Sequence, residues 1–221
     1  MIAKEGRLIL FSMLLILFPF GVYAHAFGNK ILYYLYFIFG SFYIFTIYFF
    51  RDPERKIPLD SSAILSPADG RVVSINTIND NDIGKSSQVI SVFLSLFDVH
   101  AFRYPFNGKI KRVSHKKGKF IAAFNHNASE VNEQIEIVID ASNLTIKIKQ
   151  IAGLVARRIL CYAKPNQIIE KGTRMGFIRF GSRADIVVSS NVNVCINIGE
   201  KVKAGESIIC LLYTSPSPRD Q

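Results

Sequence analysis

Cysteine is scarce in this chain and never occurs in a paired spacing. The three cysteines are Cys161, Cys195 and Cys210, and the sequence contains no CxxC motif. This pattern excludes a disulfide framework and a cysteine-based zinc site, and it favours buried thiols in a reducing compartment. We therefore predict no metal site.

Charge is missing from two long stretches near the amino terminus. Residues 8–27 and 31–50 contain no Asp, Glu, Lys or Arg. About 20 apolar residues are what a helix needs to cross the hydrocarbon core of a bilayer, at about 1.5 Å per residue. We therefore predict a hydrophobic, membrane-associated helical hairpin over residues 1–50, which either spans the bilayer or only embeds in it.

A cleaved signal peptide is the alternative for the first apolar stretch, because basic residues precede it and residues 22–24 resemble a cleavage site. The second apolar stretch follows so closely that a hairpin is the simpler interpretation. Only Lys30 lies between the two stretches, whereas several basic residues flank them: Lys4, Arg7, Arg51, Arg55 and Lys56. The positive-inside rule therefore predicts that both termini, and the domain that follows, are cytoplasmic.

Acidic residues are outnumbered, with 17 Asp and Glu against 27 Lys and Arg, for a formal net charge of +10. Such a balance favours an anionic partner. The stretch Lys109–Lys119 is basic and has no acidic residue; it is either a solvated face or a surface attracted to anionic lipid headgroups, at about 1 kcal/mol per basic residue. No nucleic-acid-binding motif is present, so we predict an anionic membrane surface as partner and no nucleic acid.

After a charged, proline-interrupted linker at residues 51–58, the sequence contains no long helical stripe; the best helix candidate is Gly153–Tyr162. Short β-branched segments bounded by turn residues predict strands instead. The predicted strands are residues 71–75, 88–94, 136–139, 144–151, 186–188 and 192–196. The fold class is therefore mainly β (α+β), with the β-rich domain at residues 59–212.

The stretch Gly199–Ile208 is similar to the hairpins of barrel-sandwich carrier domains, so we expect a barrel-sandwich-like architecture. No exposed-lysine turn accompanies it, which argues against a carrier function. The tail at residues 213–221 is rich in Ser and Pro without an apolar pattern, and we interpret it as disordered or artefactual.

Three turn-like stretches carry groups that could do chemistry: Asp69 in an Asp-Gly turn, His100 near a strand end, and the bond between Gly181 and Ser182. Each has a structural explanation, as a turn, a half-buried histidine and a strand with a glycine bend. Alternatively, the Ser182 hydroxyl attacks the unhindered Gly181 carbonyl, with an Asp and a His assisting. The residue types alone leave these interpretations open.

Six stretches are specific in combination: FFRDPERKIP (49–58), LSPADGRV (65–72), FLSLFDVHAFRYPFNGKI (93–110), ASEVNEQ (128–134), QIAGLVARRIL (150–160) and GTRMGFIRFGSRADI (172–186). Together they resemble one family, the phosphatidylserine decarboxylases in their short bacterial and archaeal form. With the hydrophobic amino terminus, they cover nearly everything before the tail.

This resemblance implies a self-processing enzyme whose cofactor is a covalent pyruvoyl group made from Ser182. Cleavage after Gly181 would leave a large and a small chain, held together as a heterodimer or in a higher oligomer. The pyruvoyl group would form a Schiff base with the serine amine of phosphatidylserine, lose CO2 and yield phosphatidylethanolamine at the cell membrane. His100 and Asp69 match motif positions and are the candidates for assisting self-cleavage or proton transfer.

Two positions depart from the longer family members. Arg103 stands where those members have a second histidine, which leaves the base for self-cleavage open, and strain at the Gly181–Ser182 bond is another driving force to consider. Arg183 follows the reactive serine where they have Ser or Thr. We predict that Arg183 and Arg103 bind the anionic groups of the substrate.

Three alternatives remain. An archaetidylserine decarboxylase would use the same chemistry on an ether lipid. A membrane-anchored serine hydrolase would keep its chain intact with a free Ser182 hydroxyl, although the sequence has no GxSxG nucleophile elbow. A non-enzymatic membrane-anchored adaptor would depend on neither cleavage nor Ser182.

Overall fold

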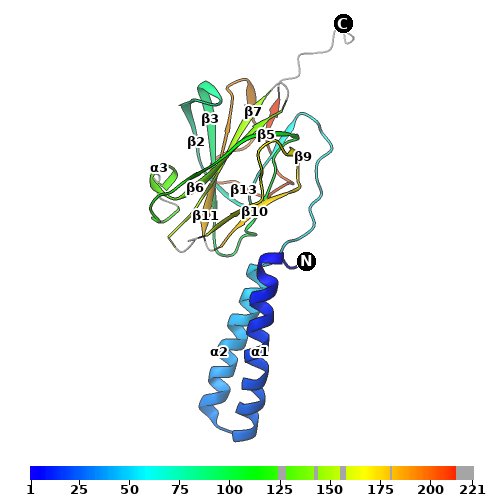
Figure 1. The fold of residues 1–221 in the computed structure, drawn as a ribbon, viewed down its shortest axis with the longest axis vertical. Coiled ribbons are helices and arrows are strands. Elements are labelled where there is room, and N and C mark those ends of the chain that lie inside the picture. Colours follow the sequence, from blue (N-terminus) through cyan, green and yellow to red (C-terminus); the bar gives the residue numbers. More distant parts are fainter. Residues whose placement is uncertain (124–127, 142–143, 155–157, 180, 213–221) are drawn as a thin grey trace. The chain divides into compact units, whose positions relative to one another are not determined.

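The computed structural model divides the chain into two compact units, Met1–Glu54 and Arg55–Gln221, which we call the helical unit and the β unit. The boundary between them falls within the predicted linker. The structure describes residues 1–123, 128–141, 144–154, 158–179 and 181–212 (Figure 1). The tail at 213–221 lies outside the described residues, so the expectation of disorder stays a prediction.

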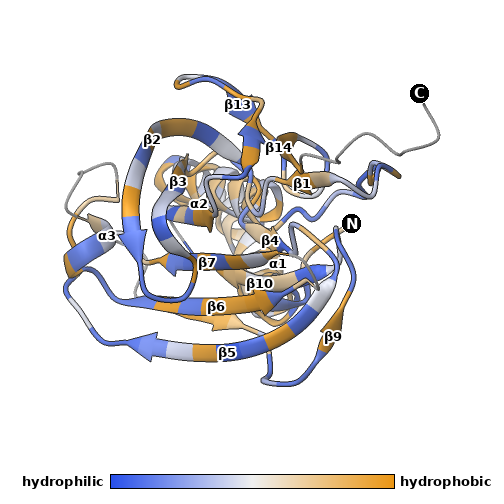
Figure 2. Cartoon of the chain, turned by 90° about the horizontal axis from the view of Figure 1, so that it is seen from above, coloured by the Kyte–Doolittle hydropathy of each residue, from blue (hydrophilic) through white to orange (hydrophobic). Residues whose placement is uncertain are grey.

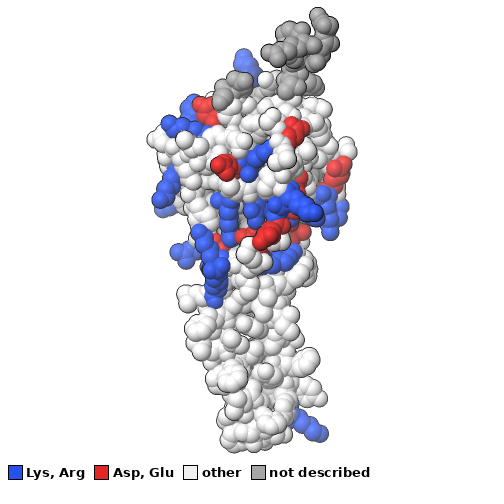
Figure 3. All heavy atoms as spheres, turned by 90° about the vertical axis from the view of Figure 1, so that its right-hand side faces the viewer, with Lys and Arg blue, Asp and Glu red and all other residues white. Residues whose placement is uncertain are grey.

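The helical unit is an antiparallel pair, α1 (Lys4–Phe27) and α2 (Lys30–Phe49). Gly28 ends α1 in the left-handed conformation, with φ of 60°, and the Asn29 side chain caps α2 by accepting the Ile31 N–H at 2.8 Å. Both helices are long and apolar enough to cross a membrane, and their surfaces are largely uncharged (Figure 3). The predicted helical hairpin is confirmed.

The β unit contains one short helix, α3 (Ala128–Val131), in its described part. Its first strands along the chain are β1 (Ala63–Leu65), β2 (Gly70–Asp80), β3 (Gly84–Leu94), β4 (Ala101–Arg103), β5 (Gly108–Lys116), β6 (Gln134–Asp140) and β7 (Thr145–Ile151). They are followed by β8 (Ile159–Cys161), β9 (Ile168–Ile169), β10 (Arg174–Ile178), β11 (Ser182–Val188), β12 (Val192–Val194), β13 (Lys201–Val202) and β14 (Ile208–Leu212).

These strands form three antiparallel sheets. The largest has the order β13-β2-β3-β11-β7-β6-β5-β9, and two small sheets have the orders β1-β14-β12 and β4-β10-β8. The long strands of the large sheet curl around one interior (Figure 2). The chain is thus mainly β with an N-terminal apolar helical pair, as the sequence predicts.

Alternation of apolar and polar residues places the core on the inner face of the large sheet. In β7, Ile146 and Ile148 belong to the buried core cluster, whereas Lys147 and Lys149 between and after them make ion pairs on the other face. Burying one such isoleucine stabilises the fold by roughly 2 kcal/mol. The period of two therefore fixes which side of each strand faces the core.

The six strands predicted from the sequence overlap β2, β3, β6, β7, β11 and β12. The helix predicted at Gly153–Tyr162 is wrong, because Ile159–Cys161 forms β8, which pairs with β10. Pairing with a buried strand overrides the weak helical pattern here. The missed helix, α3, is a single turn, too short for a periodic signal.

The outer face of the large sheet carries one largely buried ion-pair cluster. Lys147 Nζ donates to Asp80 Oδ1 and Oδ2 at 2.6 and 2.7 Å and lies 2.6 Å from Asp82 Oδ2. Burial alone would lower the pKa of Lys147, but the two carboxylates outweigh it and raise that pKa. Burial also acts to raise the pKa of Asp80. The hydrogen bond and charge of Lys147, together with the backbone N–H groups of Asp82 and Ile83, outweigh that effect and hold the pKa of Asp80 below its ordinary value.

We predict that Lys147→Met costs about 3 kcal/mol of stability at neutral pH, because it leaves the largely buried Asp80 carboxylate without its ionic partner, whereas Asp82 keeps its ion pair with Arg112. A lowered Asp pKa contributes stability above the unfolded value of about 3.9, which is lost as pH falls through the folded pKa. The deficit should therefore shrink below about pH 4. Thermal unfolding in detergent measures this loss of stability. Lys149→Met is the control, because Lys149 Nζ lies 3.7 Å from Glu136 Oε1, a longer and more exposed ion pair that contributes less. Equal losses for both variants would contradict this role.

Candidate active site

The bond between Gly181 and Ser182 lies where the chain passes from one sheet to another. β10 ends at Ile178 in a small sheet, and β11 begins at Ser182 in the large sheet. Gly181 has a φ of +55°, which glycine adopts freely and other residues adopt at a cost. The glycine thus lets the chain turn between the sheets, and its φ stores no strain of its own.

Ser182 is the first residue of β11 and pairs with Leu94 of β3. Its side chain is fully buried, and its Oγ has no hydrogen-bond partner among the described residues. An unpaired buried hydroxyl costs about 1–3 kcal/mol, so such a group in a native fold calls for an explanation. One is that the hydroxyl is kept free to react with its neighbour.

The carbonyl group of Gly181 lies against the backbone of Gly153. A Cβ atom on Gly153 would lie 2.1 Å from the Gly181 oxygen and 3.1 Å from its carbonyl carbon. No side chain fits at that distance, so Gly153 is the residue type that permits this approach. Gly153 thereby leaves room for the Gly181 carbonyl group in this position.

His100 contacts Gly181 from its amide side. The Gly181 N–H donates to His100 Nε2 at 3.4 Å, and His100 Nδ1 lies 2.9 Å from the Asp98 carbonyl oxygen. A carbonyl oxygen only accepts, so Nδ1 carries the proton and Nε2 presents its lone pair. The ring is fully buried and lies beside Phe177, with ring centroids 6.2 Å apart. His100 is therefore held as a neutral base beside the Gly181–Ser182 segment.

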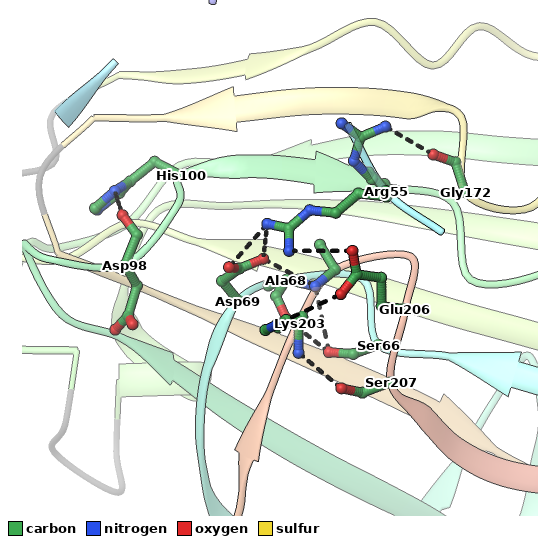
Figure 4. Close-up of polar contacts among 12 residues, drawn as sticks. Arg55, Ser66, Ala68, Asp69, Asp98, His100, Gly172, Lys203, Glu206 and Ser207 are labelled. Carbon is green, nitrogen blue, oxygen red and sulfur yellow. Dashed lines mark hydrogen bonds and ion pairs between the residues drawn. The ribbon is translucent and has the colours of Figure 1, made fainter. Parts of the chain in front are cut away.

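Asp69 lies in a separate cluster (Figure 4). Its carboxylate accepts two hydrogen bonds from Arg55 Nη2, at 2.8 and 2.9 Å, and one from the Ala204 N–H at 2.9 Å. Burial raises the pKa of Asp69, while the Ala204 N–H and the Arg55 charge act against that rise. In the described part of the chain no hydrogen bond joins Asp69 to His100 or Ser182.

The two arginines predicted to bind substrate are both engaged within the protein. Arg103 Nη1 donates to the Gly172 carbonyl at 3.0 Å. Arg183 is 5% exposed; its Nε donates to Asp185 at 2.8 Å and its Nη2 to Ser91 at 2.6 Å. Arg183 would have to leave Asp185 to hold a substrate anion, so its substrate-binding role stays a prediction for the processed enzyme.

The structure thus brings His100 to the Gly181–Ser182 segment, whereas Asp69 makes no hydrogen bond to these residues in the described part of the chain. Sequence reasoning missed two contributors, Gly153 and Arg55, although both lie in quoted motif stretches. A glycine inside an apolar strand-like stretch is the signal that could have indicated Gly153 as a point of close backbone approach. Nothing local to Arg55 indicates its partner Asp69, because that pair depends on the tertiary fold.

Among the described residues no group of three or more His, Cys, Asp or Glu could hold a metal ion. A hollow of about 900 Å³ lies elsewhere, lined by residues that include Lys109, Asp140 and Lys171. It contains none of the residues that surround Ser182. We place the candidate site at the Gly181–Ser182 bond because the reactive groups lie there.

Comparison with known proteins gives one consistent family. A family model described as phosphatidylserine decarboxylase matches residues 42–210. Proteins named phosphatidylserine decarboxylase proenzyme are similar to the chain: that of Chlorobium chlorochromatii is 44% identical, covering 76% of this chain and 79% of the relative. That of Paraburkholderia phymatum is 44% identical, covering 79% of this chain and 83% of the relative. That of Desulfotalea psychrophila is 42% identical, covering 78% of this chain and 82% of the relative.

The matched region runs from within α2 to β14 and contains His100, Gly153 and the Gly181–Ser182 bond, the groups that meet in the structure. The chain belongs to the phosphatidylserine decarboxylase family.

Proposed function

We propose that the chain is the precursor of a self-processing decarboxylase that converts phosphatidylserine to phosphatidylethanolamine and CO2. The observation that carries the proposal is the buried Ser182 hydroxyl, which follows Gly181 in the chain and has no hydrogen-bond partner among the described residues. The name proenzyme, borne by the relatives, is compatible with cleavage of the precursor.

In the proposed processing, Ser182 Oγ bonds to the Gly181 carbonyl carbon and the Gly181–Ser182 peptide bond breaks, giving an ester. Loss of the Ser182 α-proton then expels the Gly181 carboxylate and leaves dehydroalanine at position 182. Water converts this residue to a pyruvoyl group and releases ammonia. His100 Nε2, a neutral acceptor beside Gly181, is the group placed to take up a proton.

Ser182 Oγ has no hydrogen-bond partner in the described part of the chain. Replacing this side chain by the methyl group of a pyruvoyl group would therefore break no hydrogen bond there, which supports the fit of that group. Once formed, that ketone would supply the electron sink for loss of the substrate carboxylate. His100 is then the proton carrier beside it. We propose that Asp69, paired with Arg55, positions the turn before β2, and that Arg103 and Arg183 bind the anionic groups of the substrate, Arg183 after it leaves its ion pair with Asp185.

We propose that the two chains stay together after cleavage. β11, at the start of the small chain, pairs with β3 along its whole length and with β7 from Arg183 to Val187. Both neighbouring strands belong to the large chain. In addition, β14 pairs with β1. These ladders support a heterodimer that requires no covalent link.

The two apolar helices suggest membrane association. We propose that they anchor the enzyme in the cell membrane with the β unit on the cytoplasmic side. The support is the distribution of basic residues, which flank the helical pair and leave only Lys30 between the two apolar stretches. The overall charge of +10 would favour an anionic lipid surface.

Replacing Ser182 tests the proposed function. Ser182→Ala should remain one uncleaved chain and release no CO2 from phosphatidylserine, since the attacking oxygen is gone. Ser74→Ala is the matched control, because Ser74 Oγ is likewise buried without a partner among the described residues. The control should be cleaved and active by gel and CO2 assays. A Ser182→Ala protein that still releases CO2 would sink the proposal, and an uncleaved wild type that hydrolyses esters would favour a serine hydrolase.

Gly153→Ala should slow self-cleavage about 100-fold, because the new methyl group displaces the Gly181 carbonyl from the Ser182 hydroxyl. Gly108→Ala is the control: its Cβ would lie 2.5 Å from the Asp140 carbonyl oxygen, a similar clash away from the bond. Both variants should lose about 1–3 kcal/mol of stability. The fraction of cleaved chain over time measures the difference.

Hydroxylamine under mild, neutral conditions separates the possible causes of a Gly153→Ala defect, since it cleaves an ester and leaves peptide bonds intact; alkaline conditions are avoided because they would cleave the Asn107–Gly108 bond. The slow variant should stay uncleaved in hydroxylamine, because the ester does not form. Rapid release of two chains would place the defect after ester formation and contradict the positioning role of Gly153.

A further inference from the structure

The turn Ser95–Asp98 presents two large apolar side chains at its tip. Leu96 and Phe97 occupy the central positions and are 43% and 65% exposed. The Asp98 N–H donates to the Ser95 carbonyl at 3.1 Å, and the Asp98 carboxylate accepts from the Ser95 N–H and hydroxyl at 2.8 and 2.6 Å. Turn tips are usually polar, so a well-bonded turn with Leu and Phe at its centre points to an apolar partner.

This tip adjoins the candidate active site. Asp98, directly after Phe97, accepts the hydrogen bond from His100, which in turn contacts Gly181. A third exposed apolar residue, Leu154 at 62%, directly follows Gly153, which lies against the Gly181 carbonyl. Exposed apolar residues are thus sequence neighbours of two residues near Gly181: Phe97 precedes Asp98, which bonds to His100, and Leu154 follows Gly153. We call Leu96, Phe97 and Leu154 the apolar rim.

We propose that the apolar rim inserts into the lipid bilayer and seats the mouth of the active site at the headgroup layer. The inference rests on the proposed function, which requires the site to meet the serine headgroup of a phospholipid. Pulling a phospholipid out of the bilayer would expose its acyl chains to water, which costs free energy in proportion to the apolar area exposed. If the protein docks at the bilayer surface, the serine headgroup can reach the active site while the acyl chains stay buried in the bilayer.

The size of the rim favours a bilayer over a protein partner. Specific protein interfaces bury on the order of 1,000 Å² or more, with a packed core, whereas three side chains are enough for shallow interfacial insertion. The formal charge of +10 adds attraction to anionic lipid. Docking by the rim would act in addition to the helical pair, on the β unit itself.

A fluorescence experiment tests the proposal directly, because the chain contains no tryptophan. Phe97→Trp in the full chain, reconstituted into phosphatidylcholine and phosphatidylglycerol vesicles, provides a single probe. Its emission should shift to the blue, and brominated acyl chains should remove most of it. The control is Ile168→Trp, since Ile168 is 82% exposed on β9, the edge strand separated from β11 by β7, β6 and β5. Its emission should stay unquenched.

Unquenched emission from the Phe97→Trp variant would overturn the proposal, as would equal quenching of both probes. This readout needs neither cleavage nor decarboxylation, so it stands apart from the proposed function. Failure of the wild type to cleave or to release CO2 would count against the function and leave the quenching result to decide whether the rim docks.

A second test compares the kinetics on phosphatidylserine in vesicles with the kinetics on dissolved phosphatidylserine. The double variant Leu96→Ser, Phe97→Ser should raise the apparent KM for phosphatidylserine in vesicles about tenfold, equivalent to ~1.4 kcal/mol. It should self-cleave normally and keep its kcat/KM for short-chain phosphatidylserine supplied as dissolved monomers. An equal loss on both substrates would show that the tip acts within the site, and an unchanged KM on vesicles would show that no docking occurs; either contradicts the proposal.

Discussion

The pairing of β11 between β3 and β7 is the constraint on which the rest of the site depends. It fixes Ser182 at the first paired position of the strand, opposite Leu94, where the hydroxyl is buried. Just after it, Arg183 and Asp185 form a buried ion pair that also bonds to Ser91 of β3 and Ser129 of α3. The carboxyl side of the Gly181–Ser182 bond is therefore held rigidly.

The amino side of the bond is shaped by two contacts of a different kind. Gly153 has no side chain and so leaves room for the Gly181 carbonyl, and His100 accepts the Gly181 N–H. For the proposed self-cleavage, a serine held in place directly after this carbonyl would favour intramolecular attack. The positive φ at Gly181 contributes the turn between the two sheets.

The sequence predicts the parts of this fold that follow from period and length. The two uncharged stretches become α1 and α2, and alternation in segments such as residues 144–151 gives strands with the expected core face. The predicted helix at Gly153–Tyr162 fails because pairing of β8 with β10, a non-local interaction, decides that segment.

For the site, motif positions indicate His100, Gly181 and Ser182, and the fold brings these three together. Asp69 also matches a motif position, and its carboxylate is bonded to Arg55 and Ala204, so its part in self-cleavage or proton transfer stays a prediction. Contacts made by backbone alone, such as that of Gly153 with the Gly181 carbonyl, leave almost no mark in a single sequence.

The central claim is that Ser182 is consumed to make the cofactor. Intact-mass measurement of the purified protein tests it most directly. The expected result is two chains, one ending at Gly181 and one beginning at position 182. The second should be lighter than a serine-ended chain by the mass of one ammonia molecule. A single full-length mass from a preparation with full decarboxylase activity would contradict the claim.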